Sequence, residues 1–183
     1  MPNPRSERID LKSTITTVPD FPHAPVQFRD IMSLLSNPGA LIQASEDLAA
    51  LYEGEEIDYV VGIESRGFIL GGLMAAHFKA GFVPMRKPGK LPGTVISRAY
   101  ELEYATSELQ LQKGVIRPGS RVLIHDDIVA KGGTGEASVL LSREVGAEVV
   151  GFAAMIDLPE LGGGERIRKL GVPVKALMTF EGE

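Results

Sequence analysis

The chain has 183 residues, of which 44% are hydrophobic and 23% charged, proportions typical of one folded domain. It contains no cysteine, which excludes disulfides and thiolate metal sites and is typical of a cytoplasmic protein. The net charge of -5 disfavours a nucleic-acid partner, because duplex binding depends on a broad field of Lys and Arg. No apolar run approaches the roughly 20 residues of a membrane span, and segment 1–8 lacks the apolar core of a secretory signal. We therefore expect a cytoplasmic single-domain protein without a membrane or nucleic-acid partner.

The N-terminal part is expected to form two helices and an irregular flap. Helical patterns cover about 28–35 and 38–52, and the second starts with a proline directly after Asn37, which favours a helix start. Prolines interrupt segment 21–25, so we expect this segment to form a flap over a sheet. Residues 1–35 would then form a small hood.

From residue 57 onward, short β-branched runs alternate with helical stretches. This alternation is typical of parallel strands that are joined by helices. The predicted strands are 57–63, 82–85, 121–125, 148–156 and 174–180, and the predicted helices are 68–79, 134–145 and 165–170. The expected fold class is therefore α/β, with an open, mainly parallel sheet flanked by helices.

Segment 86–112 interrupts this alternation. It begins with Arg86-Lys87-Pro88-Gly89-Lys90-Leu91-Pro92-Gly93, which is too rich in Pro, Gly and positive charge for a packed element. The remainder is polar, with some strand-like alternation. Long excursions of this kind are usually functional or mobile. The alternative is a solvated hairpin without a role.

The most informative stretch is an apolar strand followed by Asp126 and Asp127 and then by Gly132, Gly133 and Thr134. Open parallel sheets bind ligands at the carboxyl edge, where the two carboxylates would lie. Glycines let the backbone approach a ligand, and a helix start with a threonine hydroxyl offers donors to a phosphate. The stretch thus offers acceptors for sugar hydroxyls and donors for a phosphate, as a ribose 5-phosphate requires. The alternative is an ordinary turn whose aspartates cap the next element.

This stretch resembles the signature of the type I phosphoribosyltransferases. The resemblance implies that Asp126 and Asp127 bind the 2- and 3-hydroxyls of ribose and that the loop from Ala130 to Thr134 binds the 5-phosphate. The family usually has Thr or Ser where this chain has Lys131. A hydroxyl donor is lost there and a cation gained, so Lys131 either reaches the phosphate or points into solvent. The chain has no Walker A loop and no Gly-x-Gly-x-x-Gly, which disfavours an ATPase or a dinucleotide enzyme.

Three further segments resemble the adenine phosphoribosyltransferases of that family, so that the similarity covers nearly the whole chain. The first is Phe21-Pro22 followed by Val-Gln-Phe-Arg-Asp at 26–30, which resembles the flap that binds adenine. It implies that Phe28 and the backbone beside Gln27 and Arg29 bind the base. Relatives often have an apolar residue where this chain has Gln27, so the Gln27 side chain would change the contacts with the base and with them the base selectivity.

The second segment, Glu64-Ser65-Arg66-Gly67-Phe68, resembles the pyrophosphate-binding loop and implies that Ser65, Arg66 and Gly67 bind the leaving group. Arg66 can form paired hydrogen bonds with phosphate oxygens. Taken alone, it would be a surface arginine at a helix start. A peptide bond in this turn can be cis in relatives, and we expect the cis peptide bond to lie between Glu64 and Ser65.

The third segment, 86–108, resembles the mobile catalytic loop of the adenine enzymes. The resemblance implies that Arg86, Lys87 and Lys90 face the pyrophosphate and that Glu103 handles the proton at the adenine imidazole ring. Tyr104 would help to close the site. Without the resemblance, the three cations would be solvated charges on a hairpin.

The implied reaction transfers ribose 5-phosphate from phosphoribosyl pyrophosphate to adenine, which gives AMP and pyrophosphate in purine salvage. The implied cofactor is Mg2+, held mainly by the ligand and water without direct protein ligands. The family also suggests a homodimer. The alternatives are an enzyme for another base, which the flap and the Glu-Leu-Glu-Tyr segment disfavour, and a noncatalytic sensor of phosphoribosyl pyrophosphate.

Overall fold

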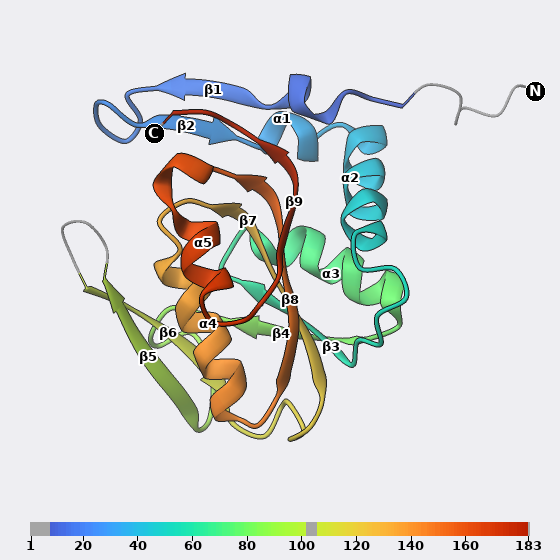
Figure 1. Cartoon of the computed structure of the whole chain (residues 1–183), viewed down its shortest axis with the longest axis vertical. Coiled ribbons are helices and arrows are strands. Elements are labelled where there is room, and N and C mark those ends of the chain that lie inside the picture. The colour runs from blue at the N-terminus through green and yellow to red at the C-terminus, as the bar shows by residue number, and fades with distance from the viewer. Residues whose placement is uncertain (1–7, 102–105, 183) are drawn as a thin grey trace, which may run out of the picture.

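A five-stranded parallel sheet is the centre of the computed structural model, which describes residues 8–101 and 106–182 (Figure 1). Every neighbouring pair of strands in this sheet runs parallel. In order across the sheet, the strands are β4 (Gly81–Met85), β3 (Tyr59–Ile63), β7 (Arg121–Val129), β8 (Glu148–Asp157) and β9 (Val174–Thr179). The expected α/β class with an open parallel sheet is confirmed.

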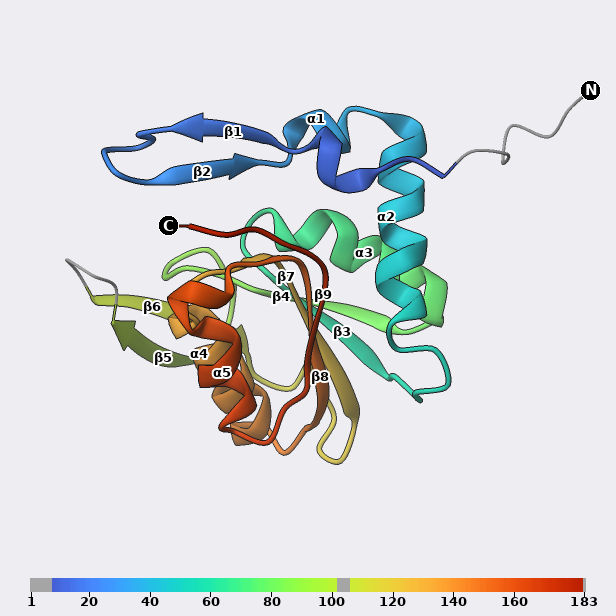
Figure 2. The same cartoon turned by 45° about the horizontal axis from the view of Figure 1, so that its top comes forward.

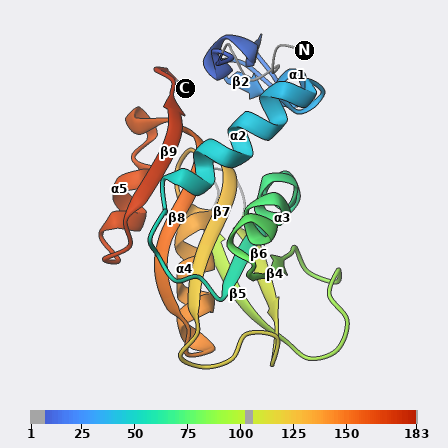
Figure 3. The same ribbon diagram turned by 90° about the vertical axis from the view of Figure 1, so that its right-hand side faces the viewer.

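Helices cover both faces of the sheet, as Figure 3 shows from the side. The helices are α2 (Pro38–Ala50) and α3 (Gly67–Phe78) on one face and α4 (Gly133–Glu144) and α5 (Gly163–Arg168) on the other. Each face has its own buried cluster, because successive strand residues point to opposite sides. On β7, Val122 and Ile124 belong to the α4 side, whereas Leu123 belongs to the α2 side. The sheet is thus buried on both faces, as parallel sheets are.

A hood lies across one end of the sheet. It consists of η1 (Leu11–Thr14), β1 (Thr16–Pro19), β2 (Gln27–Asp30) and α1 (Met32–Leu35). Strands β1 and β2 form an antiparallel hairpin, with Val18 opposite Phe28. Figure 2 shows this hairpin projecting over the body of the molecule, with the C-terminal end beneath it. The flap expected at 21–25 is the connection between the two strands.

The predicted helix at 28–35 is wrong over its first half. Residues 27–30 form a strand, and only 32–35 are helical. The strand forms because residues 16–19 offer it a partner, with Thr17 opposite Arg29. No local pattern in 28–35 carries information about that partner.

The excursion at 86–112 contains a second antiparallel hairpin, β5 (Val95–Glu101) and β6 (Thr106–Gln112). A bridge between Arg86 and Gln110 joins it to the end of β4. Leu109 and Leu111 are buried in the cluster on the α4 side of the main sheet. The hairpin is therefore packed against the body along one face, and it is more than a solvated loop. Glu103 and Tyr104 lie outside the described residues.

In the ranges 8–101 and 106–182, no helix has the length and apolar character needed to cross a bilayer.

Replacing Tyr52 by Phe tests the packing of the turn after α2 against the sheet. The buried Tyr52 hydroxyl donates a hydrogen bond of 2.8 Å to the carbonyl of Phe152, and its ring occupies the space that a side chain at Gly151 would need. Losing this bond leaves a buried carbonyl without its donor, so the free energy of unfolding should fall by about 1–3 kcal/mol. Urea denaturation measures the change. The control is Tyr59→Phe, whose hydroxyl makes no hydrogen bond within the described residues; an equal loss there would contradict the assignment.

Candidate active site

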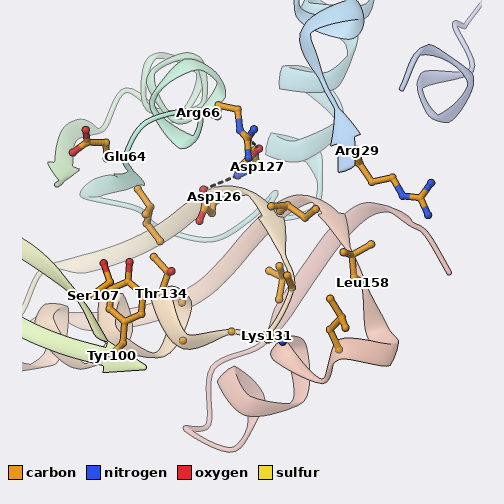
Figure 4. Close-up of a pocket in the computed structure, with 18 of the residues that line it drawn as sticks. Arg29, Glu64, Arg66, Tyr100, Ser107, Asp126, Asp127, Lys131, Thr134 and Leu158 are labelled. Carbon is orange, nitrogen blue, oxygen red and sulfur yellow. Dashed lines mark hydrogen bonds and ion pairs between the residues drawn. The ribbon is translucent and has the colours of Figure 1, made fainter. Parts of the chain in front are cut away.

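A cavity of about 830 Å³ lies between the hood and the carboxyl ends of the central strands (Figure 4). Its walls come from many places in the chain. They include strand β2 of the hood, the turn after β3, the end of β7 with the β7–α4 connection, and the loop after β8. The β5–β6 hairpin adds a further wall through Tyr100, Ser107 and Leu109. The cavity thus collects residues from almost the whole length of the chain.

The acidic pair lies within strand β7, whereas the prediction placed it directly after the end of the strand. The strand continues to Val129 because Asp126 pairs with Ala154 and Val129 with Asp157 on β8, so the predicted end at His125 is wrong. Asp127 is buried, and its backbone N–H donates 2.9 Å to a carboxylate oxygen of Asp126. Both side chains line the cavity.

The charges of this pair are not equivalent. Burial and the neighbouring charge of Asp127 raise the pKa of Asp126 well above its usual range. Asp127 is instead compensated by Arg66, whose Nε lies 2.5 Å from its carboxylate oxygen (Figure 4). The site therefore offers one carboxyl that is more easily protonated and one that is paired with a cation.

The loop from Ala130 to Thr134 lies beside the acidic pair and lines the cavity. Gly132 caps α4 in the left-handed conformation, with φ of 76°, and a side chain there would meet the backbone of Gly163 at 2.7 Å. Only glycine fits this position. The predicted helix start at Thr134 is wrong by one residue, because α4 begins at Gly133 and Thr134 is its second residue. Gly133 and Thr134, the first residues of α4, nevertheless line the cavity. The backbone N–H groups at a helix start have no partner within the helix, so they favour an anion there.

The turn after β3 contains the expected cis peptide between Glu64 and Ser65. Ser65 and Arg66 line the cavity, whereas Gly67 is the first residue of α3 and packs against β7. A side chain at Gly67 would come within 2.9 Å of the carbonyl of His125. The role of Gly67 in this geometry is therefore to let the turn approach β7.

Glu64 binds the basic run after β4, a partnership that the sequence analysis missed. Its carboxylate lies 2.6 Å from Lys90 Nζ and 3.3 Å from Arg86 Nε, and it accepts 2.9 Å from the Lys87 backbone N–H. Burial raises the pKa of Glu64, but the bonds from Lys90, Lys87 and Arg86 outweigh burial and lower it to about 2. Of Arg86, Lys87 and Lys90, which were predicted to face the pyrophosphate, only Lys87 lines the cavity. The opposite charges at 64 and in 86–90 were the available signal.

The hood contributes an aromatic wall. Phe28 lines the cavity together with Gln27 and Arg29. The Arg66 guanidinium lies 5.2 Å from the centre of the Phe28 ring, and Phe21 packs edge-on against the same ring at 5.2 Å. This contact joins the turn after β3 to the hood.

The loop after β8 faces the hood across the cavity with Leu158 and Leu161. Ser107 and Leu109 line the cavity from the β5–β6 hairpin and were not predicted. They are two residues apart on β6 and so share one face of the strand. That spacing was the only local signal for them. Between residues 8 and 182, leaving out 102–105, no group of three or more His, Asp or Glu side chains is placed to hold a metal.

Residues 31–172 match the family described as the phosphoribosyl transferase domain. The chain belongs to this family of phosphoribosyltransferases.

Within that family the chain belongs to the adenine phosphoribosyltransferases. It is 51% identical over 172 residues to the adenine phosphoribosyltransferase of Methylorubrum extorquens, covering 94% of this chain and 95% of the relative. The crystal structure of the Rhodothermus marinus enzyme is 49% identical, with a TM-score of 0.88 over 93% of this chain and 96% of that one. The Saccharomyces cerevisiae enzyme, solved with an imino-altritol bisphosphate and adenine, is 36% identical with a TM-score of 0.86, covering 92% and 97%.

Acid should remove the stabilising effect of Glu64. Its pKa falls from 4.5 to about 2 on folding, so its contribution is complete above pH 4.5 and is lost as pH falls from there towards 2. We expect Glu64→Gln to be less stable than the parent protein at neutral pH, with a difference that shrinks as the pH falls through this range. Urea denaturation at a series of pH values measures it.

The control for the change in net charge is Glu46→Gln, an exposed position on α2. A difference between parent and Glu64→Gln that stays constant from neutral to acid pH would contradict the assignment.

Proposed function

We propose that this protein transfers ribose 5-phosphate from phosphoribosyl pyrophosphate to adenine, giving AMP and pyrophosphate for purine salvage. One observation carries the proposal: a single cavity joins the acidic pair and the phosphate loop to the pyrophosphate turn on one side and the aromatic hood on the other. The reaction needs the same three compartments, for sugar phosphate, leaving group and base. Membership of the adenine phosphoribosyltransferases supports it.

In the sugar compartment, Asp126 and Asp127 would accept hydrogen bonds from the ribose hydroxyls. The residues from Ala130 to Thr134 would bind the 5-phosphate through the N–H groups that begin α4. The transition state carries positive charge on the sugar, and the nearby carboxylates would stabilise it. Because Asp127 is bound to Arg66 at 2.5 Å, substrate would have to share or replace that contact.

In the leaving-group compartment, Ser65, Arg66 and Lys87 line the cavity and would bind the pyrophosphate. Arg86 and Lys90 would join them only after leaving Glu64, which holds both in this structure. The loop 86–108 would close over the site and keep water from the activated sugar.

Magnesium is the proposed cofactor. Mg2+ prefers oxygen ligands, and the carboxylates of Asp126 and Asp127 present such oxygens to the cavity. They would hold the ion through its bound water, with most ligands coming from the pyrophosphate group. When bound, the ion supplies charge neutralisation for the leaving group.

In the base compartment, Phe28 would stack on adenine, and the backbone beside Gln27 and Arg29 would read its edge. The Arg29 side chain points away from the acidic pair (Figure 4), which leaves its backbone for the base. Glu103 would handle the proton at the imidazole ring of adenine, and Tyr104 would cover it.

A homodimer and a cytoplasmic location are the remaining parts of the proposal. The dimer is supported by exposed apolar side chains on α3 and β4, two elements that are in contact. Ile69 and Leu73 are four residues apart on α3, and Phe82 lies on β4, which contacts that helix. Such a patch is typical of a surface that a partner covers. The cytoplasmic location fits a chain that has no cysteine and so needs no oxidising compartment to form disulfides.

Nucleotide formation tests the reaction directly. The purified protein is supplied with phosphoribosyl pyrophosphate, Mg2+ and one base at a time: adenine, hypoxanthine, guanine, xanthine or orotate. We expect AMP from adenine and no nucleotide from the other bases. A nucleotide formed from another base would show that the assignment of the hood to adenine is wrong. Binding of phosphoribosyl pyrophosphate without any product would favour the noncatalytic sensor.

Glu103→Gln tests the proposed proton transfer. The variant keeps the size of the side chain but cannot take up or deliver the proton, so turnover should fall by about a hundredfold to ten-thousandfold. Binding of phosphoribosyl pyrophosphate should be unchanged. The matched control is Glu108→Gln on the same hairpin, next to Ser107 but on the opposite face of β6. Equal turnover in Glu103→Gln and the parent enzyme would remove Glu103 from the mechanism.

A further inference from the structure

The last described residues cross from the sheet to the hood. After β9 ends at Thr179, residues 180–182 run under the β1–β2 hairpin, and the C-terminal end lies beside β2 (Figures 1 and 2). We call residues 180–182 the C-terminal strap. The sequence analysis gave it no role, and it contributes no residue to the lining of the cavity.

On the hood side, the strap is held by two cations. Lys12 Nζ and Arg29 Cζ each lie 4.8 Å from the centre of the Phe180 ring. A side-chain nitrogen of Arg29 also donates 2.9 Å to the backbone carbonyl of Glu181. Phe180 itself is half-buried against the hydrophobic cluster that includes Leu11 and Ile15 of the hood. The strap therefore binds both η1 and β2.

On the body side, the strap is fixed to the loop that forms the opposite wall of the cavity. The Phe180 N–H donates 3.2 Å to the carbonyl of Asp157, and the Gly182 N–H donates 3.0 Å to a carboxylate oxygen of Glu160. These two acceptors flank Leu158, which lines the cavity. The strap thus bridges the two walls of the base compartment.

Arg29 links the strap to the base-facing strand. Its backbone belongs to β2, directly after Phe28, whereas its guanidinium is directed away from the acidic pair (Figure 4). The same guanidinium also donates 2.6 Å to the Thr17 hydroxyl on β1. One side chain thereby fixes both hairpin strands and the strap, and a binding wall is precise only when such supporting contacts fix it.

We propose that the C-terminal strap positions β2 against the Leu158 wall and so sets the affinity of the enzyme for its base. Phe180 is a positioning residue, because it acts through Arg29 and Lys12 and not by touching the base. The inference rests on the proposed role of the hood in base binding. Within the described residues, no hydrogen bond or cation–π contact joins the strap to the phosphate loop or to the pyrophosphate turn, so the strap should act on phosphoribosyl pyrophosphate only indirectly, through the contact of Phe28 with Arg66.

The experiment measures kcat and the KM of each substrate for a protein ending at Thr179, for Phe180→Leu and for Phe180→Tyr. Truncation removes two cation–π contacts and the hydrogen bonds of the strap, so the KM for adenine should rise about tenfold, with kcat nearly retained. The KM for phosphoribosyl pyrophosphate should rise much less than the KM for adenine. Phe180→Leu, which keeps an apolar side chain without the ring, should raise the adenine KM by about threefold. Phe180→Tyr keeps the aromatic ring, so its KM for adenine should equal that of the parent protein.

The control is Lys175→Ala, which removes a contact of the same kind away from the cavity. Lys175 Nζ lies 4.6 Å from the centre of the Tyr52 ring and donates to the carbonyl of Leu51. The KM for adenine should be unchanged in this control. A truncated protein with the parent KM for adenine would overturn the proposal, as would a parallel rise of both KM values with a lowered Tm. Failure of the parent enzyme to form AMP would instead overturn the proposed function, so the two failures are distinguishable.

Discussion

The parallel pairing of β3 with β7 is the constraint on which the site depends. Because the two strands run side by side in the same direction, the turn after β3 and the acidic end of β7 emerge at one edge of the sheet. Arg66 and Asp127 meet there at 2.5 Å although they are far apart in the chain. The approach is possible because Gly67 leaves room for the carbonyl of His125. A residue with a side chain at that position would push α3 and its turn away from β7.

Charge is arranged locally in a protein whose net charge is -5. Arg66 of the turn is bound to Asp127, and Lys90 and Arg86 of the basic run are bound to Glu64. Without anionic partners, cations placed this close together would repel one another. The two carboxylates therefore let these cations lie close to the turn after β3.

The proposed base compartment combines an N-terminal and a C-terminal part of the chain. Its aromatic wall comes from β2 in the hood, and its aliphatic wall comes from the loop after β8. The hood contains a two-stranded hairpin, and an isolated hairpin is only marginally stable in water. Elsewhere in the hood, η1 and α1 contact α2, and the C-terminal strap contacts Arg29 of β2 through Phe180, so both sets of contacts support the hairpin.

The sequence by itself determined the parallel sheet, the acidic pair and the glycine loop, because each of these follows from a short run of neighbouring residues, whereas the cis turn was expected from the resemblance to relatives. Only the tertiary structure decided that 27–30 is a strand, that Glu64 holds Arg86 and Lys90, and that Arg29 binds the strap. The physical reason is that these features depend on partners far away in the chain: Glu64 and Lys90 are 26 residues apart, and Arg29 and Glu181 are 152 apart. Hydrophobic periodicity and turn residues report on local geometry, and they carry no information about which distant group satisfies a charge or a strand edge.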